Sequence, residues 1–386
     1  MSKKKRIVLF GVFFVLLMFS LAICVKGEDA DGGYETLPEE YGDFIGSIEE
    51  GVLDKLPDGA LEGDSQSLLS ATEEMASVSY LLNMLLSAFG VAVGEALPIL
   101  AWLMGTVILS AVAQTFASGL GEGLSGAVSF ACRLCAFSSI AAASVESLSR
   151  LSAYFDSLFA LVAGFVPLSG VLYAMGGNLT GAASGSAALS ATLAVCQFFF
   201  SKTVIPVFCV CLSLSLLSVF DGQSALSSGS IAATVKKWYT TALAFIMMIL
   251  TAAIGAQGIL ANKADGAAMR GMKFAASSFI PISGGTISST LGTLASSVEL
   301  LRGTVGVLGI VIILLMLIPV SVYLAAVRAA LGIASFSAGM LGCGSEKRLL
   351  DEIGSLYGYL EGIAAISAAV FIIAMAIFAS TASAVA

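Results

Sequence analysis

Six charged side chains stand inside otherwise apolar stretches of this sequence, where a charge is the group best able to do chemistry. A charge inside a membrane costs about 2.5–3.5 kcal/mol on insertion scales, so it usually faces a partner or a water-filled cavity. Lys202 is the most isolated, with no other charged residue for a dozen positions on either side. For each charge the plainer interpretation is a structural pair or a side chain that reaches the membrane surface. The charges are Arg133, Glu146, Asp156, Lys202, Arg328 and Glu361, with the uncharged Gln114, Gln197 and Gln257 in similar surroundings.

Enzymatic chemistry has little support in the composition. The chain contains no histidine, the commonest general base and metal ligand. Among its seven cysteines, Cys132 and Cys135 have redox spacing, but they lie in an apolar helical stretch rather than at a strand-to-helix turn. We expect the cysteines to behave as small apolar residues. We therefore predict no catalytic residue, no cofactor, no metal site and no nucleic-acid partner.

Four prolines in the apolar part of the chain form two matched pairs. Pro167, in a Phe-Val-Pro-Leu-Ser-Gly sequence, precedes Pro206; Pro281, in a Phe-Ile-Pro-Ile-Ser-Gly sequence, precedes Pro319. An offset of 113 to 114 residues relates the two pairs. Proline inside a helix removes a hydrogen bond and costs about 3 kcal/mol. We interpret the match as an internal duplication; the alternative is chance similarity in a chain rich in Ile, Val, Ser and Gly.

These prolines predict broken or re-entrant helices. In membrane transporters, broken helices at corresponding positions of two halves mark a pathway or a binding site. The Ser-Gly and Gly-Gly sequences beside the prolines could act as hinges, although close helix packing is the default role of small residues. The candidate hinge and site residues are Pro167, Gly170, Lys202, Pro206, Pro281, Gly284, Gly285 and Pro319.

The fold class follows from composition and from the length of the apolar runs. The chain is 58% hydrophobic and 11% charged, with a mean hydropathy of +0.98, whereas soluble domains contain about 25% charged residues. Several runs reach the ~20 residues that a helix needs to cross a bilayer. They do not alternate with the period of two that barrel strands require. We predict an all-α, polytopic integral membrane helical bundle.

The membrane domain is expected to occupy residues 77–386, with repeat units at about 124–222 and 238–339. Run 187–220 is too long for one crossing, so we expect a break near Pro206. We expect about six to eight crossings in total. The other candidate spans are 78–93, 96–117, 124–145, 157–175, 238–260, 304–327 and 359–382.

The first 76 residues differ in character from the rest. Residues 1–27 combine a basic start with an apolar run, which predicts a signal peptide; an uncleaved anchor is the alternative. Residues 28–76 form an acidic extracytoplasmic segment, with fifteen carboxylates and one base from Glu28 to Glu74. Within it, residues 39–56 predict an amphipathic helix. Its apolar face should meet the membrane surface, a partner protein or this protein's own loops.

The second repeat unit carries a recognisable sequence. Ala264-Asp265-Gly266, Lys273-Phe274-Ala275, the segment from Phe279 to Gly285, Val305-Gly306-Val307-Leu308-Gly309 and Ile318-Pro319 together resemble the stage III sporulation protein AE family of endospore-forming bacteria. The plan of a signal sequence, a short polar exported segment and a multi-spanning domain is also similar. The specific part of the resemblance runs from about Lys263 to Pro319.

The resemblance implies a multi-pass protein of the mother cell, in the outer forespore membrane. It would be a membrane subunit of the channel-like assembly that joins mother cell and forespore, and it would serve as the conduit or platform of that assembly. Its partners would be the other stage III sporulation proteins AA to AH, forespore protein Q and the lipid bilayer, with a possible homo-oligomer. The family supplies no catalytic or ligand residue to carry over. A stand-alone secondary transporter, with a site between the two repeated halves, and a purely structural scaffold remain alternatives.

Overall fold

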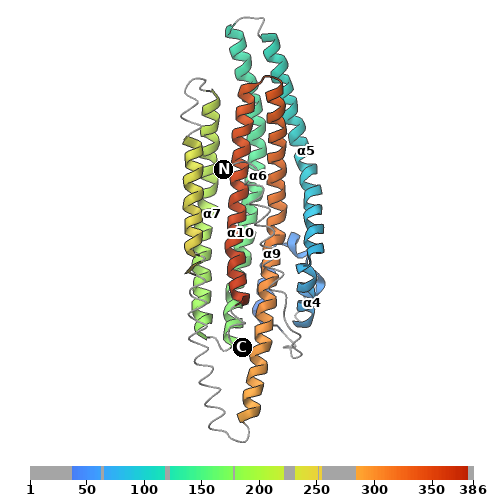
Figure 1. The fold of residues 1–386 in the computed structure, drawn as a ribbon, viewed down its shortest axis with the longest axis vertical. Helices are drawn as coiled ribbons and strands as arrows, with labels where there is room; N and C mark the ends of the chain where they lie inside the picture. Colours follow the sequence, from blue (N-terminus) through green and yellow to red (C-terminus); the bar gives the residue numbers. More distant parts are fainter. Residues whose placement is uncertain are drawn as a thin grey trace.

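In a computed structural model, the protein is a bundle of long α-helices (Figure 1). The structure describes residues 37–61, 65–117, 122–176, 179–220, 231–250, 252–253 and 284–380, and no strand occurs in these ranges. The all-α polytopic membrane bundle expected from composition is therefore confirmed. The named elements are α2 (Glu39–Gly46), α3 (Glu50–Leu53), the 3-10 turn η1 (Asp58–Ala60), α4 (Ser65–Ala76), α5 (Val78–Ala117), α6 (Glu122–Met175), α7 (Leu179–Phe220), α9 (Gly284–Met340) and α10 (Gly344–Ser380).

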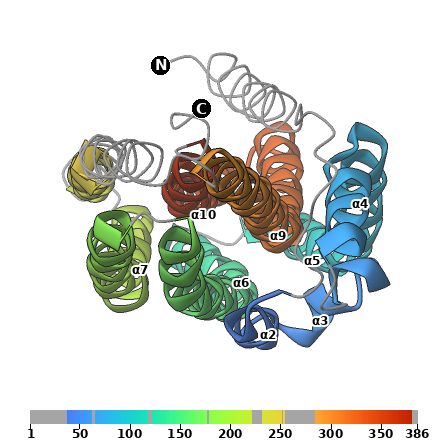
Figure 2. The ribbon, with the colours of Figure 1, turned by 90° about the horizontal axis from the view of Figure 1, so that it is seen from below.

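Helices α5, α7 and α9 run up the long axis of the bundle, and α6 and α10 run down it (Figure 1). Seen along that axis, α9 and α10 lie in the middle, while α5 and α7 lie on opposite flanks (Figure 2). Burial follows this arrangement: 83% of the most apolar window of α9 is buried inside the protein, against 22% for α5. The core is thus built around α9.

Two glycines set how closely α9 and α10 approach. A Cβ atom at Gly306 would lie 2.7 Å from the Cβ of Ala379, and one at Gly309 would lie 2.8 Å from the Sδ of Met375. Small residues let membrane helices pack with their backbones close together. These glycines belong to the Val305-Gly306-Val307-Leu308-Gly309 sequence, so that sequence has a packing role in the α9–α10 pair.

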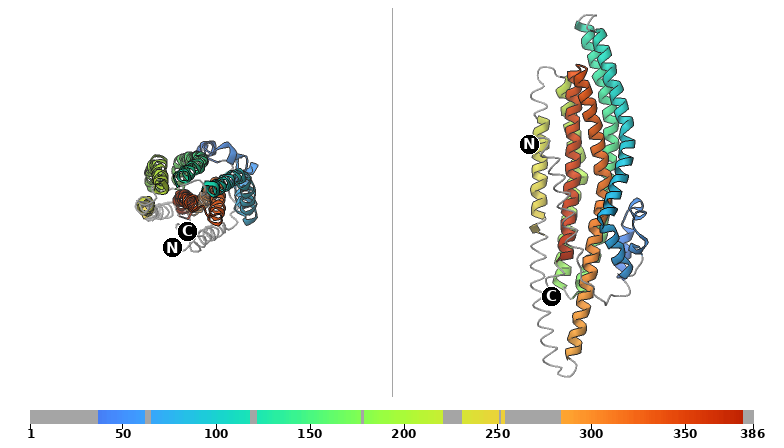
Figure 3. Two further views of the ribbon diagram at one scale, coloured as in Figure 1. Left: turned by 90° about the horizontal axis from the view of Figure 1, so that it is seen from above. Right: turned by 45° about the vertical axis from the view of Figure 1, so that its right-hand side comes forward.

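The bundle is elongated along its helices, as the side view shows (Figure 3). Helix α6 has 54 residues and α9 has 57, which at about 1.5 Å per residue gives roughly 80 Å for each. The hydrocarbon core of a membrane is only about 30 Å thick. Parts of these helices must therefore lie outside the lipid or be covered by protein.

Several sequence-based expectations about the spans are wrong. Runs 124–145 and 157–175 lie in the single helix α6, and runs 78–93 and 96–117 lie in α5. The break expected near Pro206 is absent, because α7 continues through it, as α6 does through Pro167 and α9 through Pro319. Each of these helices therefore continues although its proline cannot donate a backbone hydrogen bond.

Five helices in the described ranges are long and apolar enough to cross a membrane: Val78–Phe116, Phe130–Met175, Ala182–Ser215, Leu300–Met340 and Gly344–Ala379. The expected span at 238–260 is described only in part, so the total of six to eight crossings stays a prediction. The duplication stays a prediction for the same reason: Pro281 lies outside the described residues, as does the expected signal peptide at 1–27.

The acidic segment packs against the bundle through its apolar side. The single helix expected over residues 39–56 is instead α2 and α3, separated where the Ser47 hydroxyl donates to the carbonyl of Phe44 at 2.6 Å. Serine favours such local bonds over helix continuation. Phe44 packs edge-on against Phe165 of α6, with ring centroids 5.9 Å apart. Of the three alternatives left open by the sequence, the apolar face therefore meets this protein itself, at helix α6.

Candidate functional site: a polar belt across the bundle

The residues proposed from the sequence do not converge on one cavity. Pro167 of α6, and Lys202 and Pro206 of α7, are exposed, while Pro319 of α9 is half-buried. Gly170 lies where α6 meets α7, because a Cβ there would approach the hydroxyl of Ser186 at 2.9 Å. Gly284 and Gly285 begin α9. Among the candidates whose exposure the structure describes, Lys202 and Pro206 share a surface, one turn apart on the outer side of α7, while Pro281 lies outside the described residues.

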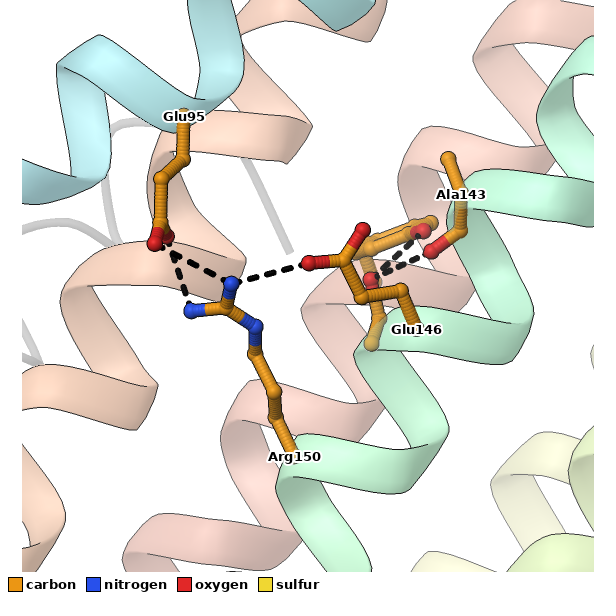
Figure 4. A network of polar contacts seen from close by, with 6 residues as sticks. Glu95, Ala143, Glu146 and Arg150 are labelled. Atoms are coloured by element: carbon orange, nitrogen blue, oxygen red, sulfur yellow. Dashed lines mark hydrogen bonds and ion pairs between the residues drawn. The ribbon is translucent and has the colours of Figure 1, made fainter.

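A charged cluster at mid-height joins α5 to α6 (Figure 4). Arg150 donates to Glu95 from Nη1 at 2.8 Å and from Nη2 at 3.1 Å, and Nη2 also donates to Glu146 at 2.8 Å. The two-pronged contact with Glu95 fits the planar guanidinium to the carboxylate. Arg150 also lies over the ring of Tyr323 on α9, 4.2 Å from its centroid. One arginine therefore ties three helices together.

Neighbouring polar contacts extend this cluster into a belt. Ser147 and Tyr357 share a hydrogen bond of 3.0 Å between α6 and α10. Arg328 of α9 donates to Glu361 of α10 at 3.1 Å. Gly358 leaves room for this arginine, because a Cβ there would lie 3.0 Å from the Cζ of Arg328. The belt fixes the relative heights of its helices, since a displaced charge would lose its partner in apolar surroundings.

The structural-pair interpretation is right for three of the charges singled out in the sequence: Glu146, Arg328 and Glu361. Asp156 and Gln197 are exposed on α6 and α7. Arg133 lies in α6, and Gln257 falls outside the described residues. Sequence reasoning missed Glu95 and Arg150; the signal was the four-residue spacing of Glu146 and Arg150, which allows an ion pair on one helix.

Two further polar clusters lie away from the belt. Arg302, buried between helices, stacks 4.1 Å from the ring centroid of Tyr173 and 5.2 Å from that of Phe378. Near the other end of the bundle, buried Glu346 accepts hydrogen bonds from Ser110 at 2.7 Å and from Gln114 at 3.0 Å. Both clusters hold helices that are distant in sequence.

A polar depression of about 580 Å³ opens beside Glu346. It lies at the turn between α9 and α10 and is lined by Gln114, Gly342, Gly344, Ser345, Lys347, Arg348 and Asp351. The described cysteines form no disulfide, and the described residues contain no group of three or more His, Cys, Asp or Glu side chains that could hold a metal ion. The paired polar groups named above thus hold helices of the described bundle together.

A model of the family described as Stage III sporulation protein AE matches residues 64–382. The chain belongs to this family. The stage III sporulation protein AE match begins just before α4 and covers every long helix, while α2 and α3 precede it. It includes the Arg150 cluster, the α9–α10 glycines and Lys202.

Stage III sporulation protein AE of Bacillus subtilis (strain 168) is 26% identical to this chain over 159 residues. That match covers 41% of this chain and 39% of the relative, so the chain aligns with well under half of the relative's length. No solved structure matches the chain.

Proposed function

We propose that this protein is a membrane subunit of the channel-like assembly that joins mother cell and forespore, and that it sits in the outer forespore membrane. Membership in the stage III sporulation protein AE family carries the proposal. The partners proposed are the other stage III sporulation proteins AA to AH and forespore protein Q. The protein would serve as conduit or platform of the assembly, without a catalytic step of its own.

Two features of the bundle support a role inside a larger assembly. Its long helices exceed the thickness of the hydrocarbon core by more than twofold, so apolar helix surface is available to other membrane proteins. The acidic segment buries its apolar side against α6 and leaves carboxylates outward. Those of Glu39, Asp43, Glu50 and Asp54 are exposed and could face other subunits between the two membranes.

A stand-alone transporter with a site between two halves draws less support. Such a site needs its broken helices and its charge to converge at the middle of the membrane. Lys202 and Pro206 instead lie on the outer face of α7, and Pro167 is exposed on α6. Within the described residues, the charges of the belt are already paired with one another: Arg150 with Glu95 and Glu146, and Arg328 with Glu361.

Deletion of the gene in its own host tests the proposal. We expect the mutant to complete engulfment and then fail to form heat-resistant spores, and a copy expressed only in the mother cell should restore them. A fluorescent fusion should surround the forespore. Normal spore counts in the deletion strain, or rescue only by a copy expressed in the forespore, would contradict the proposal.

A further inference from the structure

Lys202 carries a lone charge on the outer surface of the bundle. It is exposed on α7, with Phe198 and Pro206 one turn away on either side. No hydrogen bond or ion pair joins Lys202 to another residue of the described ranges. An unpaired charge at membrane depth is unfavourable by about 2.5–3.5 kcal/mol on insertion scales. A carboxylate from outside the chain would remove that penalty.

The opposite flank of the bundle has the complementary charge. Glu95 and Glu146 share the single guanidinium of Arg150, which leaves one negative charge in excess. This cluster is open to its surroundings: the side chains of Glu95 and Glu146 are 36% and 56% exposed. The cluster thus presents an acidic surface on the α5–α6 side.

The two charges lie at nearly the same height. Phe155 of α6 and Phe200 of α7 pack with ring centroids 5.2 Å apart, which sets the register of these antiparallel helices. Arg150 is five residues from Phe155, and Lys202 is two residues from Phe200 in the same direction along the axis. At 1.5 Å per residue, their heights differ by about 5 Å, within reach of a lysine side chain. Copies of one protein in one bilayer share the same height.

Within one chain, Lys202 belongs to α7 and Glu95 belongs to α5, and these two helices lie on opposite flanks of the bundle (Figure 2). A second copy placed alongside would bring Lys202 of one copy against the Glu95–Arg150–Glu146 cluster of the next. Such a contact joins two different surfaces, so it can repeat from copy to copy and close into a ring if the rotation permits.

We propose that copies of this protein associate side by side in the membrane, with α7 of one copy against the α5–α6 flank of its neighbour. The ion pair between Lys202 and the acidic cluster fixes the register of this contact. The inference depends only on the two flanks, so it holds whether or not the protein belongs to a channel.

Disulfide cross-linking tests the contact in the full-length protein, after replacement of the seven native cysteines by alanine. Val145→Cys and Val210→Cys are suitable reporters, since Val145 is 69% exposed, Val210 is 51% exposed, and each lies ten residues from the Phe155–Phe200 pair on the same side. The double variant should form a ladder of covalent oligomers in native membranes. Each single variant alone should stay monomeric, and a mixture of the two should give dimers.

A charge exchange then tests the ion pair. Lys202→Glu should lower the cross-linked fraction about tenfold or more, because like charges across an interface cost several kcal/mol. Glu146→Lys should do the same alone, and combining both substitutions should restore the ladder, which excludes misfolding as the cause. Cross-linking in the single variants, dimers without higher oligomers in the double variant, or a ladder unchanged by Lys202→Glu would overturn the proposal.

Discussion

Helices α9 and α5 are both long and apolar, yet they occupy opposite environments. In its most apolar window α9 is 83% buried and α5 only 22%. Residues such as Leu308, Ile312 and Leu315 of α9 are fully enclosed, whereas Leu86, Leu97 and Leu109 of α5 are more than half exposed. Apolar content alone therefore does not distinguish a central helix from an outer one.

The surrounding lipid explains why apolar content does not decide which helix is central. Lipid tails are as apolar as leucine, so the hydrophobic effect does not drive one membrane helix inside another. What distinguishes α9 is shape and pairing: glycines where α10 approaches, and side chains such as Tyr323 and Arg328 that contact charged partners. Substitutions that act through packing should thus affect α9 and leave α5 nearly unchanged.

Matched leucine truncations should give the largest contrast. Leu308→Ala, at a site with no exposure, should lower the free energy of unfolding by about 2–5 kcal/mol, since it removes buried contacts and leaves a cavity. Leu97→Ala, at a site 55% exposed, should change it by less than about 0.5 kcal/mol. Thermal melts or steric trapping of purified protein would measure both. Equal losses would mean that α5 is as enclosed as α9.

Substitution of Arg150, which joins α5 to α9, should cause the second-largest loss of stability. Arg150→Met leaves Glu95 and Glu146 without their shared partner, and we expect a loss of about 2 kcal/mol. The triple variant Arg150→Met, Glu95→Gln, Glu146→Gln should recover part of that loss, because no carboxylate is then left uncompensated. A single variant as stable as the wild type would show that the cluster does not hold the helices.

Glycine-to-alanine substitutions should give effects of opposite sign in the two helices. Gly306→Ala should destabilise the protein by about 1–2 kcal/mol, because the new Cβ would lie 2.7 Å from that of Ala379. Gly94→Ala on α5 meets nothing within 4 Å, so it should stabilise by up to about 1 kcal/mol through helix propensity. Melting temperatures of the two variants, measured side by side, decide this. A gain at Gly306 would contradict the close approach of α9 and α10.

The sequence predicted what depends on local composition and missed what depends on neighbours. The membrane-helix class and the Glu146, Arg328 and Glu361 pairs could be inferred, because charge in an apolar run demands a partner. The joining of two expected spans into one helix could not be inferred, since hydropathy marks apolar runs but not where a helix ends. No glycine or proline interrupts residues 145–157, and polar residues there contact neighbouring helices: Arg150 contacts Glu95 of α5, and Ser147 contacts Tyr357 of α10. The placement of Lys202 on an outer flank depends on which helix faces α7, which one sequence does not reveal.

The acidic segment packs against the outside of the bundle. Substitutions there should therefore change the stability of the protein least. The Tyr41 hydroxyl donates to the carbonyl of Ala60 at 2.7 Å, so Tyr41→Phe should weaken docking of α2 by about 1 kcal/mol. Burial raises the pKa of the Tyr41 phenol, while an unfolded tyrosine titrates near pH ~10. Its contribution is therefore complete below about pH 10 and is lost as the pH rises further. Thermal melts from pH 8 to pH 11 should show a steeper decline in melting temperature for the wild type than for Tyr41→Phe. The other tyrosines are common to both proteins, so they do not contribute to this difference. Parallel declines would mean that Tyr41 is not buried in the docked segment.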